Sequence, residues 1–584
     1  MADRIHVSRR SLLKQVAGGA VAVGVQRADA AAAGPDVPPP QPPPIESDLA
    51  ATERILGLAY TEAKRGQLAR SYDDTRKNLG RVHALSLPND VSPAARFDPR
   101  LPGKTYGLPK PGIRGKAPAP DHIPTSPADI ALAPAWKHAG WLRTRQISST
   151  ELTRLYLDRI DRLAPSLENF ITVTRDLALQ QAARADADLA RGRIRSKLHG
   201  VPYGLKDLFD VTGVRTTWGA EPYKDRVASS KAAIVDKLEN AGAVLLGKTA
   251  LGALAYGDIW FGGRSRNPWN PDEGSSGSSA GSASATAAGL VGFSIGTETL
   301  GSIVSPSNRC GTTGIRPTFG RVSRHGGMSL CWSWDKVGPI CRTVDDCALT
   351  LEIINGYDAR DWGSIDAPLG WDWQGNARGL RVGYVPAWFE GTAVTEVDRR
   401  ALQAVRDTGA ELVEVNVQAL PYDLLSTLVF IEAAAAFSEL TLTNRDDELK
   451  WQDDLAWPNS WRRAHLFPAV EMVQLERLRR QTMVAFDQLF GGIDALIGPV
   501  SAPGVLAATN ATGHPCLVLK AGFVERPTRK ITDELLDADG PKHRVPRAIA
   551  LWSALFREDV LITLGRAVEQ ALAVSGEHPP LASA

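Results

Sequence analysis

Cysteine is scarce in this chain, with five residues among 584, and no two of them form a Cys-x-x-Cys pair. So small a number argues against a fold built on disulfides, and the missing pair argues against a structural zinc site. We expect the thiols to be free and buried, although Cys341 and Cys347 could pair after export. The five cysteines are Cys310, Cys331, Cys341, Cys347 and Cys516.

A long run of one charge is also missing. The chain carries 67 Lys and Arg against 65 Asp and Glu, which gives a formal net charge of +2. Because no basic stretch could neutralise a phosphate backbone, nucleic acid is not expected as a partner. No internal repeat is present either.

The N-terminal apolar stretch, residues 16–25, is too short for a permanent membrane span, which needs about 20 apolar residues. It follows a basic start and precedes Ala28-Asp29-Ala30, and this order predicts a signal peptide over residues 1–30. The segment SRRSLLK at residues 8–14 resembles the twin-arginine export motif. We therefore expect a periplasmic or secreted protein that crosses the inner membrane already folded.

The composition, with 43% hydrophobic and 23% charged residues, is typical of a soluble globular protein with one large core. A proline-rich linker is expected over residues 31–47, because PPPQPPP favours an extended chain. Residues 48–126 form a helical and then proline-rich N-terminal extension, with helix expected at about 49–79. The main domain is expected to cover residues 127–584.

Helical and strand patterns alternate in that domain. Ser148 followed by Glu151 is a capping-box pattern, and apolar residues recur at helical spacing until Pro165, where we expect the helix to stop. A second helix is expected at residues 232–240, followed by a buried strand at 243–246. This alternation predicts an α/β fold built on one large sheet.

Two short motif matches are rejected on their context. Residues 242–249, GAVLLGKT, match a phosphate-binding loop, but the four apolar residues between the glycines look like a strand rather than a loop. Residues 277–281, GSSAG, match a nucleophile elbow, yet loop residues precede them instead of a buried strand. No histidine lies in a comparably marked segment, and His199 and His514 are expected only to make structural hydrogen bonds.

A third match extends over most of the chain. Lys206 lies in GLKD, Ser278 in the Ser/Gly stretch at residues 276–282, and Ser302 in GTETLGSI at residues 296–303. Separations of 72 and 24 residues, in that order, resemble the three elements of the amidase signature family. The resemblance covers roughly residues 126–524 and includes LHGVP at 198–202, NPWN at 267–270, GIRPTFG at 314–320, VGP at 337–339 and NATGHP at 510–515.

The resemblance implies the amidase signature fold, one large mixed β-sheet covered on both faces by helices. It also implies a serine nucleophile at Ser302 that forms an acyl-enzyme, with its proton passing through Ser278 to Lys206. Lysine acts as a base only when neutral, and burial lowers its pKa. Taken singly, these residues could equally be an exposed Lys206–Asp207 salt bridge, a helix cap at Ser278 and a loop serine.

The family places its oxyanion hole on backbone N–H groups just before and at the nucleophile, which here are those of Thr299, Leu300, Gly301 and Ser302. Ser279, at the start of a small-residue helix expected over 280–288, should help to hold Ser278, and Asp207 is expected to support the site. No metal and no cofactor are predicted.

The chain departs from the family pattern at several positions. Leu300 stands where a glycine is usual, so its φ must be negative. Glu298 replaces the commoner aspartate, and Val304 replaces an arginine found in many members, which disfavours acidic amide substrates. Trp332 and Trp334 are either core residues or the wall of an apolar or aromatic substrate pocket, to which Trp260-Phe261 adds aromatic surface.

The sequence thus predicts hydrolysis of a small-molecule linear amide. An ester or carbamate hydrolase would use the same three residues. The glutamine-hydrolysing subunit of a tRNA-dependent amidotransferase is a further alternative, which an export signal disfavours. A non-catalytic protein on a decayed amidase frame is disfavoured because all three reactive groups are present. The substrate and the oligomeric state stay open.

Overall fold

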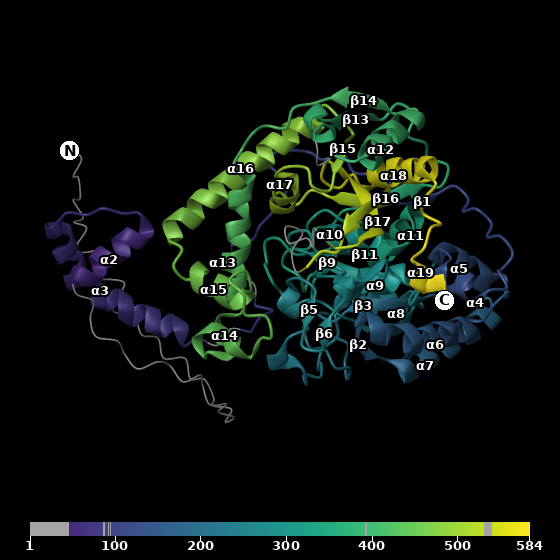
Figure 1. Ribbon diagram of the computed structural model, residues 1–584, viewed down its shortest axis with the longest axis horizontal. Helices are drawn as coiled ribbons and strands as arrows, with labels where there is room; N and C mark the ends of the chain where they lie inside the picture. Colours follow the sequence, from purple (N-terminus) through teal and green to yellow (C-terminus); the bar gives the residue numbers. More distant parts are fainter. Residues whose placement is uncertain are drawn as a thin grey trace, which may run out of the picture.

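A mixed sheet of eleven strands forms the centre of the molecule (Figure 1). The coordinates are a computed structural model that describes residues 46–85, 88–91, 93, 95–391, 394–530 and 540–583. In spatial order the strands are β14 (Glu411–Glu414), β13 (Arg381–Tyr384), β15 (Ala495–Pro499), β17 (Lys542–Ser553), β16 (Cys516–Pro527), β10 (Thr313–Arg316), β11 (Lys336–Cys341), β9 (Phe293–Glu298), β3 (Pro202–Lys206), β4 (Val244–Thr249) and β2 (Phe170–Val173). The predicted α/β fold with one large mixed sheet is confirmed.

Strands β9, β3 and β4 run parallel to one another near one end of this sheet. All residues of β3 and β4 are buried, as expected for parallel strands covered on both faces. Since parallel strands end at the same edge, Lys206 at the end of β3 and Glu298 at the end of β9 lie at one edge of the sheet.

Helices cover both faces of the sheet. Neighbouring residues of a strand point to opposite faces. On β10, a Cβ at Gly314 would meet Ser307 of α10 (Val304–Cys310), whereas the next side chain, Thr313, hydrogen-bonds Glu569 of α18 (Glu558–Leu572). Further helices that contact the sheet are α6 (Ser149–Leu167), α7 (Arg175–Ala190), α9 (Ala280–Ala287), α11 (Val344–Ile354) and α12 (Glu396–Asp407), and α8 (Ala233–Asn240) packs on α11.

Several predicted elements are present at the expected places. Ser148 and Glu151 form the complete capping box of α6, and α8 follows the expected range. The strand expected at 243–246 is β4, which begins at Val244 and continues to Thr249. The predicted end of α6 at Pro165 is wrong, because the helix continues to Leu167. A proline so close to a helix end removes only one backbone hydrogen bond, and this leaves the last turn intact.

The rejected phosphate-loop match is a buried strand, as predicted. Lys248 lies within β4, and its ammonium group donates to Asp207 Oδ1 at 2.8 Å and to Thr216 Oγ1 at 2.7 Å. Lys248 and Asp207 have no exposed surface. The lysine therefore has an internal counter-ion and does not face a ligand.

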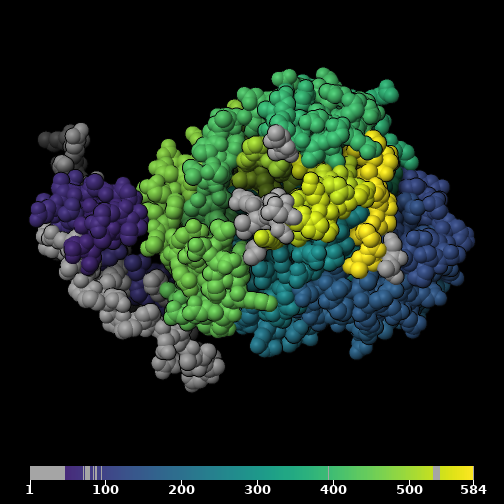
Figure 2. Space-filling view, viewed as in Figure 1, coloured from purple at the N-terminus to yellow at the C-terminus, as the bar shows by residue number. Residues whose placement is uncertain are grey.

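The helical part of the N-terminal extension lies outside the sheet-bearing body. Two helices, α2 (Glu46–Leu56) and α3 (Glu62–His83), replace the single helix expected at 49–79, and Gly57 between them takes a left-handed φ of +65°. They lie at the end of the molecule farthest from the sheet, beyond α13 (Ser426–Ala436), α15 (Trp457–Ala464) and α16 (Ala469–Gly491) (Figures 1 and 2).

The predicted signal peptide, residues 1–30, and nearly all of the predicted linker, residues 31–47, lie outside the described residues. Among the helices that the described residues form, none has both the length and the apolar character that a membrane span needs. All five cysteines are buried free thiols, as expected, and Cys341 is not bonded to Cys347.

Candidate active site

Lys206 stands at the last position of β3 and is completely buried. Its ammonium group reaches three hydroxyl oxygens: Ser278 Oγ at 2.8 Å, Ser279 Oγ at 3.1 Å and Thr297 Oγ1 at 2.8 Å. No carboxylate within the described ranges contacts it, so the alternative of a Lys206–Asp207 salt bridge is wrong; Asp207 instead pairs with Lys248.

Burial lowers the pKa of Lys206 from its usual value to about 7, although the carboxylates of Asp335 and Glu298 oppose this effect. The ammonium form loses most of its hydration here and gains only hydroxyl partners. A substantial fraction of the side chain is therefore the neutral amine at neutral pH.

The hydroxyl neighbours have an ordered pattern of hydrogen bonds. Ser279 Oγ donates to the carbonyl oxygen of Thr297 at 3.0 Å and accepts from the backbone N–H of Thr297 at 3.1 Å. Ser279 is thus a fixed acceptor for Lys206. A neutral lysine that donates to Ser279 and Thr297 directs its lone pair toward Ser278. Ser279 Oγ thus binds both the lysine and β9, and no hydrogen bond from this hydroxyl to Ser278 is present among the described residues.

Ser278 and Ser302 are brought to the same place by the backbone. The N–H of Ser279, next to Ser278, donates to the carbonyl oxygen of Ser302 at 3.2 Å. Ser278 is 1% exposed and Ser302 is 7% exposed, and the Gly277–Ser278 peptide bond is cis. The Ser302 hydroxyl makes no hydrogen bond to any residue in the described part of the chain, which leaves it available to a ligand.

The Glu298 carboxylate holds the loop that carries Ser302 in place through hydrogen bonds. Its Oε2 accepts from the backbone N–H groups of Ile303 and Val304 at 2.8 and 2.9 Å. Its Oε1 accepts from Arg316 at 2.8 Å and from Asn510 at 2.9 Å. Burial raises the pKa of Glu298, but Arg316 and these hydrogen bonds outweigh burial and hold it below its usual value.

The backbone N–H groups from Thr299 to Ser302 differ from those of Ile303 and Val304, which donate to Glu298. Within the ranges that the structure describes, none of these four groups donates to a protein acceptor. Gly301 takes a left-handed φ of +86°, whereas Leu300 is not among the residues with positive φ, which meets the condition expected for a leucine there. The loop thus presents a row of N–H donors beside the Ser302 hydroxyl.

The loop at residues 327–335 forms the wall next to this site. Asp335 accepts from Thr299 Oγ1 at 2.6 Å and from the N–H groups of Leu330 and Cys331 at 2.8 and 3.0 Å. A small cavity of about 20 Å³ between this loop and β9 is lined by Thr297 and Thr299, among others.

The two tryptophans of this wall have different places. Trp334 has no exposed surface and packs in a hydrophobic cluster with Val304 and Leu425. Of the two alternatives for Trp334, core packing is therefore correct and the pocket wall is not, because its ring is buried within this cluster. Trp332 is half-buried and lines a large cavity described below. Trp260 is 8% exposed and packs edge-on against Phe261.

Sequence reasoning missed two residues at the site. Thr297 lies within the third motif but was not singled out. Asn89 belongs to the N-terminal extension: its side chain exchanges hydrogen bonds with the backbone of Ser329, at 2.8 and 2.7 Å, and its carbonyl accepts from Trp332 Nε1. Only the tertiary structure connects residue 89 with residue 329.

The rejected elbow motif needs one correction. A short strand, β8 (Asn270–Gly274), does precede Ser278, but it pairs only with β7 (Arg266–Asn267) and is not part of the main sheet. The histidines are structural, as expected: His199 Nε2 contacts the carbonyl of Ala185 at 3.2 Å, and His514 Nδ1 contacts Thr512 Oγ1 at 2.7 Å.

Comparison with known sequences gives a consistent result. A family model described as Amidase matches residues 151–515. A glutamyl-tRNA(Gln) amidotransferase subunit of Trichlorobacter lovleyi is 40% identical over 309 residues, which are 51% of this chain and 63% of that protein. The chain thus spans less than two thirds of that relative. The same subunit of Anaeromyxobacter dehalogenans is 34% identical over 73% of this chain and 94% of that protein.

Solved structures share the fold. The native peptide amidase of Stenotrophomonas maltophilia superposes with a TM-score of 0.63 at 26% identity, covering 77% of this chain and 98% of that chain. The family match begins at residue 151, so the extension that carries Asn89 lies outside it.

The titration of Lys206 is a direct test of the site. NMR of the protein with ¹³C-labelled lysine should show an ε-methylene of Lys206 with a midpoint of about pH 7. Below this midpoint the group is ammonium and above it the neutral amine predominates. Lys206→Met should remove this transition, whereas Lys520→Met should remove only a separate one, expected at about 8. A Lys206 midpoint above 10 would contradict the assignment.

Proposed function

Because the chain belongs to the amidase family, we propose that it hydrolyses the C–N bond of a linear amide through an acyl-enzyme on Ser302. The observation that carries this proposal is the completely buried Lys206, which lacks a carboxylate partner in the described part of the chain and hydrogen-bonds Ser278. A buried lysine held as a partly neutral amine among hydroxyl groups is unusual for a structural residue, because burial without a counter-ion is costly.

In the acylation step, Ser302 Oγ attacks the amide carbonyl as Ser278 takes its proton and passes its own proton to neutral Lys206. Collapse of the tetrahedral intermediate breaks the C–N bond, and the same relay returns a proton to the departing amine. Water then repeats the sequence on the ester and releases the acid. A serine suits the middle of the relay because its hydroxyl both donates and accepts.

The developing oxyanion is held by the backbone N–H groups of residues 299–302. Glu298 supports this role because it binds the next two N–H groups and so fixes the turn without occupying these four. One preorganised donor of this kind contributes about 3–4 kcal/mol to transition-state stabilisation.

A neutral, apolar or aromatic acyl group is the substrate class we favour. Val304, where an arginine would hold a substrate carboxylate, is buried and offers no charge. The half-buried side chain of Leu506 lies close to Gly301, and together with the half-buried Leu300 it supplies apolar surface near the loop that carries Ser302.

An ester or carbamate hydrolase is the first alternative, because the same residues perform the same acyl transfer. The second is a glutamine-hydrolysing subunit, which the names of the two sequence relatives favour. Against it stand the missing arginine at position 304 and the N-terminal extension that precedes the family match.

We also propose that the chain is exported to the periplasm or beyond. The basic start, the apolar segment and the cleavage pattern at residues 28–30 support this proposal, as does the twin-arginine segment. Export of a folded protein would separate it from the cytoplasmic machinery of tRNA charging.

Replacement of the nucleophile tests the mechanism. Ser302→Ala should lower kcat at least about a thousandfold, because no other group can form the acyl-enzyme. Mass spectrometry of the protein treated with a fluorophosphonate should find one adduct, on Ser302. The matched variant Ser305→Ala should keep this adduct, and an adduct on another serine would refute the assignment.

Substrate class is tested with a matched panel. Hexanamide and 3-phenylpropanamide should have kcat/KM values at least about tenfold above those of glutamine and of an acidic amide of equal length, because no cation receives the carboxylate. A preference for the acidic amide would overturn the apolar site. The methyl esters of the same acids, and carbamates that carry the same hydrocarbon groups, show whether a C–N bond or a C–O bond is cleaved preferentially.

Export is tested at the N-terminus. Expressed from its full sequence in a bacterium with a twin-arginine pathway, the protein should begin at Ala31 and occur outside the cytoplasm. Replacing Arg9 and Arg10 with lysine should retain the uncleaved chain in the cytoplasm. Equal export of both forms would contradict the proposal.

A further inference from the structure

The N-terminal extension contacts the loop at residues 327–335 (the wall loop), which borders the proposed catalytic site. The contact is made by Asn89. Its side-chain amide donates to the carbonyl oxygen of Ser329 at 2.8 Å, and its amide oxygen accepts from the Ser329 N–H at 2.7 Å. The backbone carbonyl of Asn89 accepts from Trp332 Nε1 at 3.2 Å. One residue of the extension therefore holds the wall loop through three hydrogen bonds, at two positions.

The backbone of Ser329 depends on Asn89 for its hydrogen bonds. The residue before it, Met328, donates to the carbonyl oxygen of Leu208 at 3.0 Å and so fixes the start of the wall loop near the end of β3. For the N–H and the carbonyl of Ser329, Asn89 is the only partner that the described residues provide. Ser329 is half-buried, so loss of both bonds would leave two polar groups poorly solvated.

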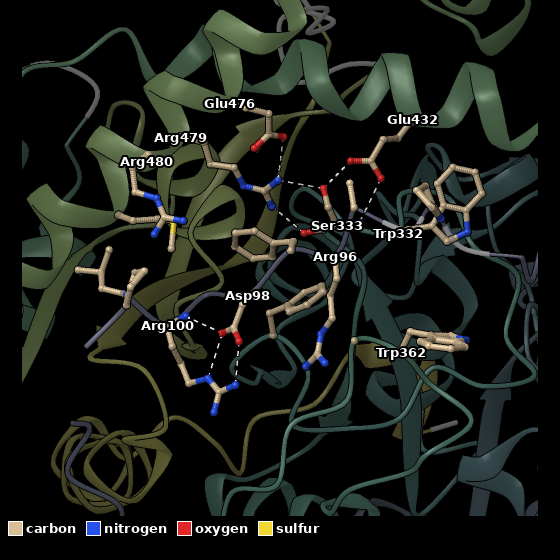
Figure 3. Close-up of a pocket in the computed structure, with 18 of the residues that line it drawn as sticks. Arg96, Asp98, Arg100, Trp332, Ser333, Trp362, Glu432, Glu476, Arg479 and Arg480 are labelled. Atoms are coloured by element: carbon tan, nitrogen blue, oxygen red, sulfur yellow. Dashed lines mark hydrogen bonds and ion pairs between the residues drawn. The ribbon is translucent and has the colours of Figure 1, made fainter. Parts of the chain in front are cut away.

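The wall loop lines two cavities. Ser329 and Asp335 line the small cavity of about 20 Å³. Trp332 and Ser333 line a cavity of about 720 Å³, whose other walls include α16 and side chains from residues 93–104 of the extension (Figure 3). A side chain or backbone group beside open space has fewer packing contacts than one in a close-packed core. Hydrogen bonds therefore contribute much of what fixes this part of the loop.

The far end of the wall loop has separate anchors. Glu432 of α13 accepts from the Ser333 N–H at 3.1 Å, and Arg479 of α16 donates to the Ser333 carbonyl at 2.7 Å, so both contacts meet at one residue (Figure 3). The Arg479 guanidinium lies 3.6 Å from the ring centroid of Phe97, which belongs to the extension. Asn89 thus supplies the anchor that is missing between Met328 and Trp332.

Hydrogen bonds connect the residue that Asn89 holds with the proposed oxyanion hole. Leu330 directly follows Ser329, and the N–H groups of Leu330 and Cys331 donate to Asp335 Oδ2 at 2.8 and 3.0 Å. The other oxygen of this carboxylate accepts from Thr299 Oγ1 at 2.6 Å. Thr299 carries the first of the four backbone N–H groups beside Ser302, so the wall loop is one carboxylate away from them.

We propose that Asn89 is a positioning residue for the proposed catalytic site. By fixing Ser329 it keeps the N–H groups of Leu330 and Cys331 on Asp335, and Asp335 holds Thr299 in the orientation that its backbone N–H needs to receive the oxyanion. Such donors contribute only when they are preorganised, and a displacement of about 1 Å is enough to slow catalysis. This inference rests on the proposed function. It gives a role in catalysis to an extension that lies outside the family match.

Hydrogen exchange of the full chain carrying Ser302→Ala tests the loop without any turnover. Adding Asn89→Ala should speed deuterium uptake at least about fivefold in peptides that cover residues 328–336, because the Ser329 N–H and carbonyl lose their partners and the loop opens more often. Uptake in peptides from β4, in the core of the same domain, should change less than about twofold.

Kinetics of the active protein test the connection to Thr299. Asn89→Ala should lower kcat for 3-phenylpropanamide at least about fivefold and change KM less than about twofold, because the N–H donors act on the transition state. Thr299→Val removes the hydroxyl that donates to Asp335 but keeps the backbone N–H. The double variant should have a kcat within about twofold of the slower single variant, because both changes break the same connection.

The matched control is Lys104→Met, which breaks the ion pair between the same extension and Asp487 of α16 and leaves the wall loop untouched. It should change the loop exchange and kcat less than about twofold. Unchanged loop exchange in Asn89→Ala would overturn the proposal, as would an unchanged kcat or additive losses in the double variant. If the wild-type protein cleaves no amide, the proposed function fails, and the exchange measurement still decides whether Asn89 holds the loop.

Discussion

The burial of one lysine amine without a counter-ion from the described residues is the constraint on which the site depends. Lys206 ends a fully buried strand of a sheet covered on both faces, so water cannot solvate its charge. Three hydroxyl groups replace the water, and none of them compensates the charge fully. The fold therefore holds the lysine partly neutral, which is the state that a base requires.

Unlike Lys206, the buried charged residues Asp207 and Glu298 near it have partners of opposite charge. Asp207 pairs with Lys248, and Glu298 pairs with Arg316, so each of these charges has a partner at 2.8 Å. Such pairs keep neighbouring carboxylates away from the Lys206 amine and tie the ends of the parallel strands together. Lys248 and Arg316 are thus buried cations with a carboxylate partner, whereas Lys206 has only hydroxyl partners among the described residues, as the proposed base requires.

The N-terminal extension is joined to the main domain at the wall beside this site. Asn89 binds the backbone of Ser329, and Phe97 lies beneath the guanidinium of Arg479, which in turn binds Ser333. The loop at residues 327–335 therefore lines both the small cavity next to Thr299 and the large cavity. Asn89 thus contacts the same loop that Asp335 anchors to Thr299.

Sequence alone determined the fold class, the buried strand at Lys248, the capping box at Ser148 and the negative φ required of Leu300, because each follows from local pattern or from backbone sterics. Through the resemblance of its motifs to the amidase signature family, it also selected Lys206, Ser278 and Ser302 as candidates; their catalytic roles and the export signal stay predictions. Only the tertiary structure decided which groups surround the Lys206 amine, that Asp207 binds Lys248 instead, and that Trp334 is core while Trp332 is not. It also revealed the large cavity and the hydrogen bonds that join Asn89 to Ser329 and Trp332. The reason is that burial and pairing depend on contacts between residues far apart in the chain, which no local pattern records.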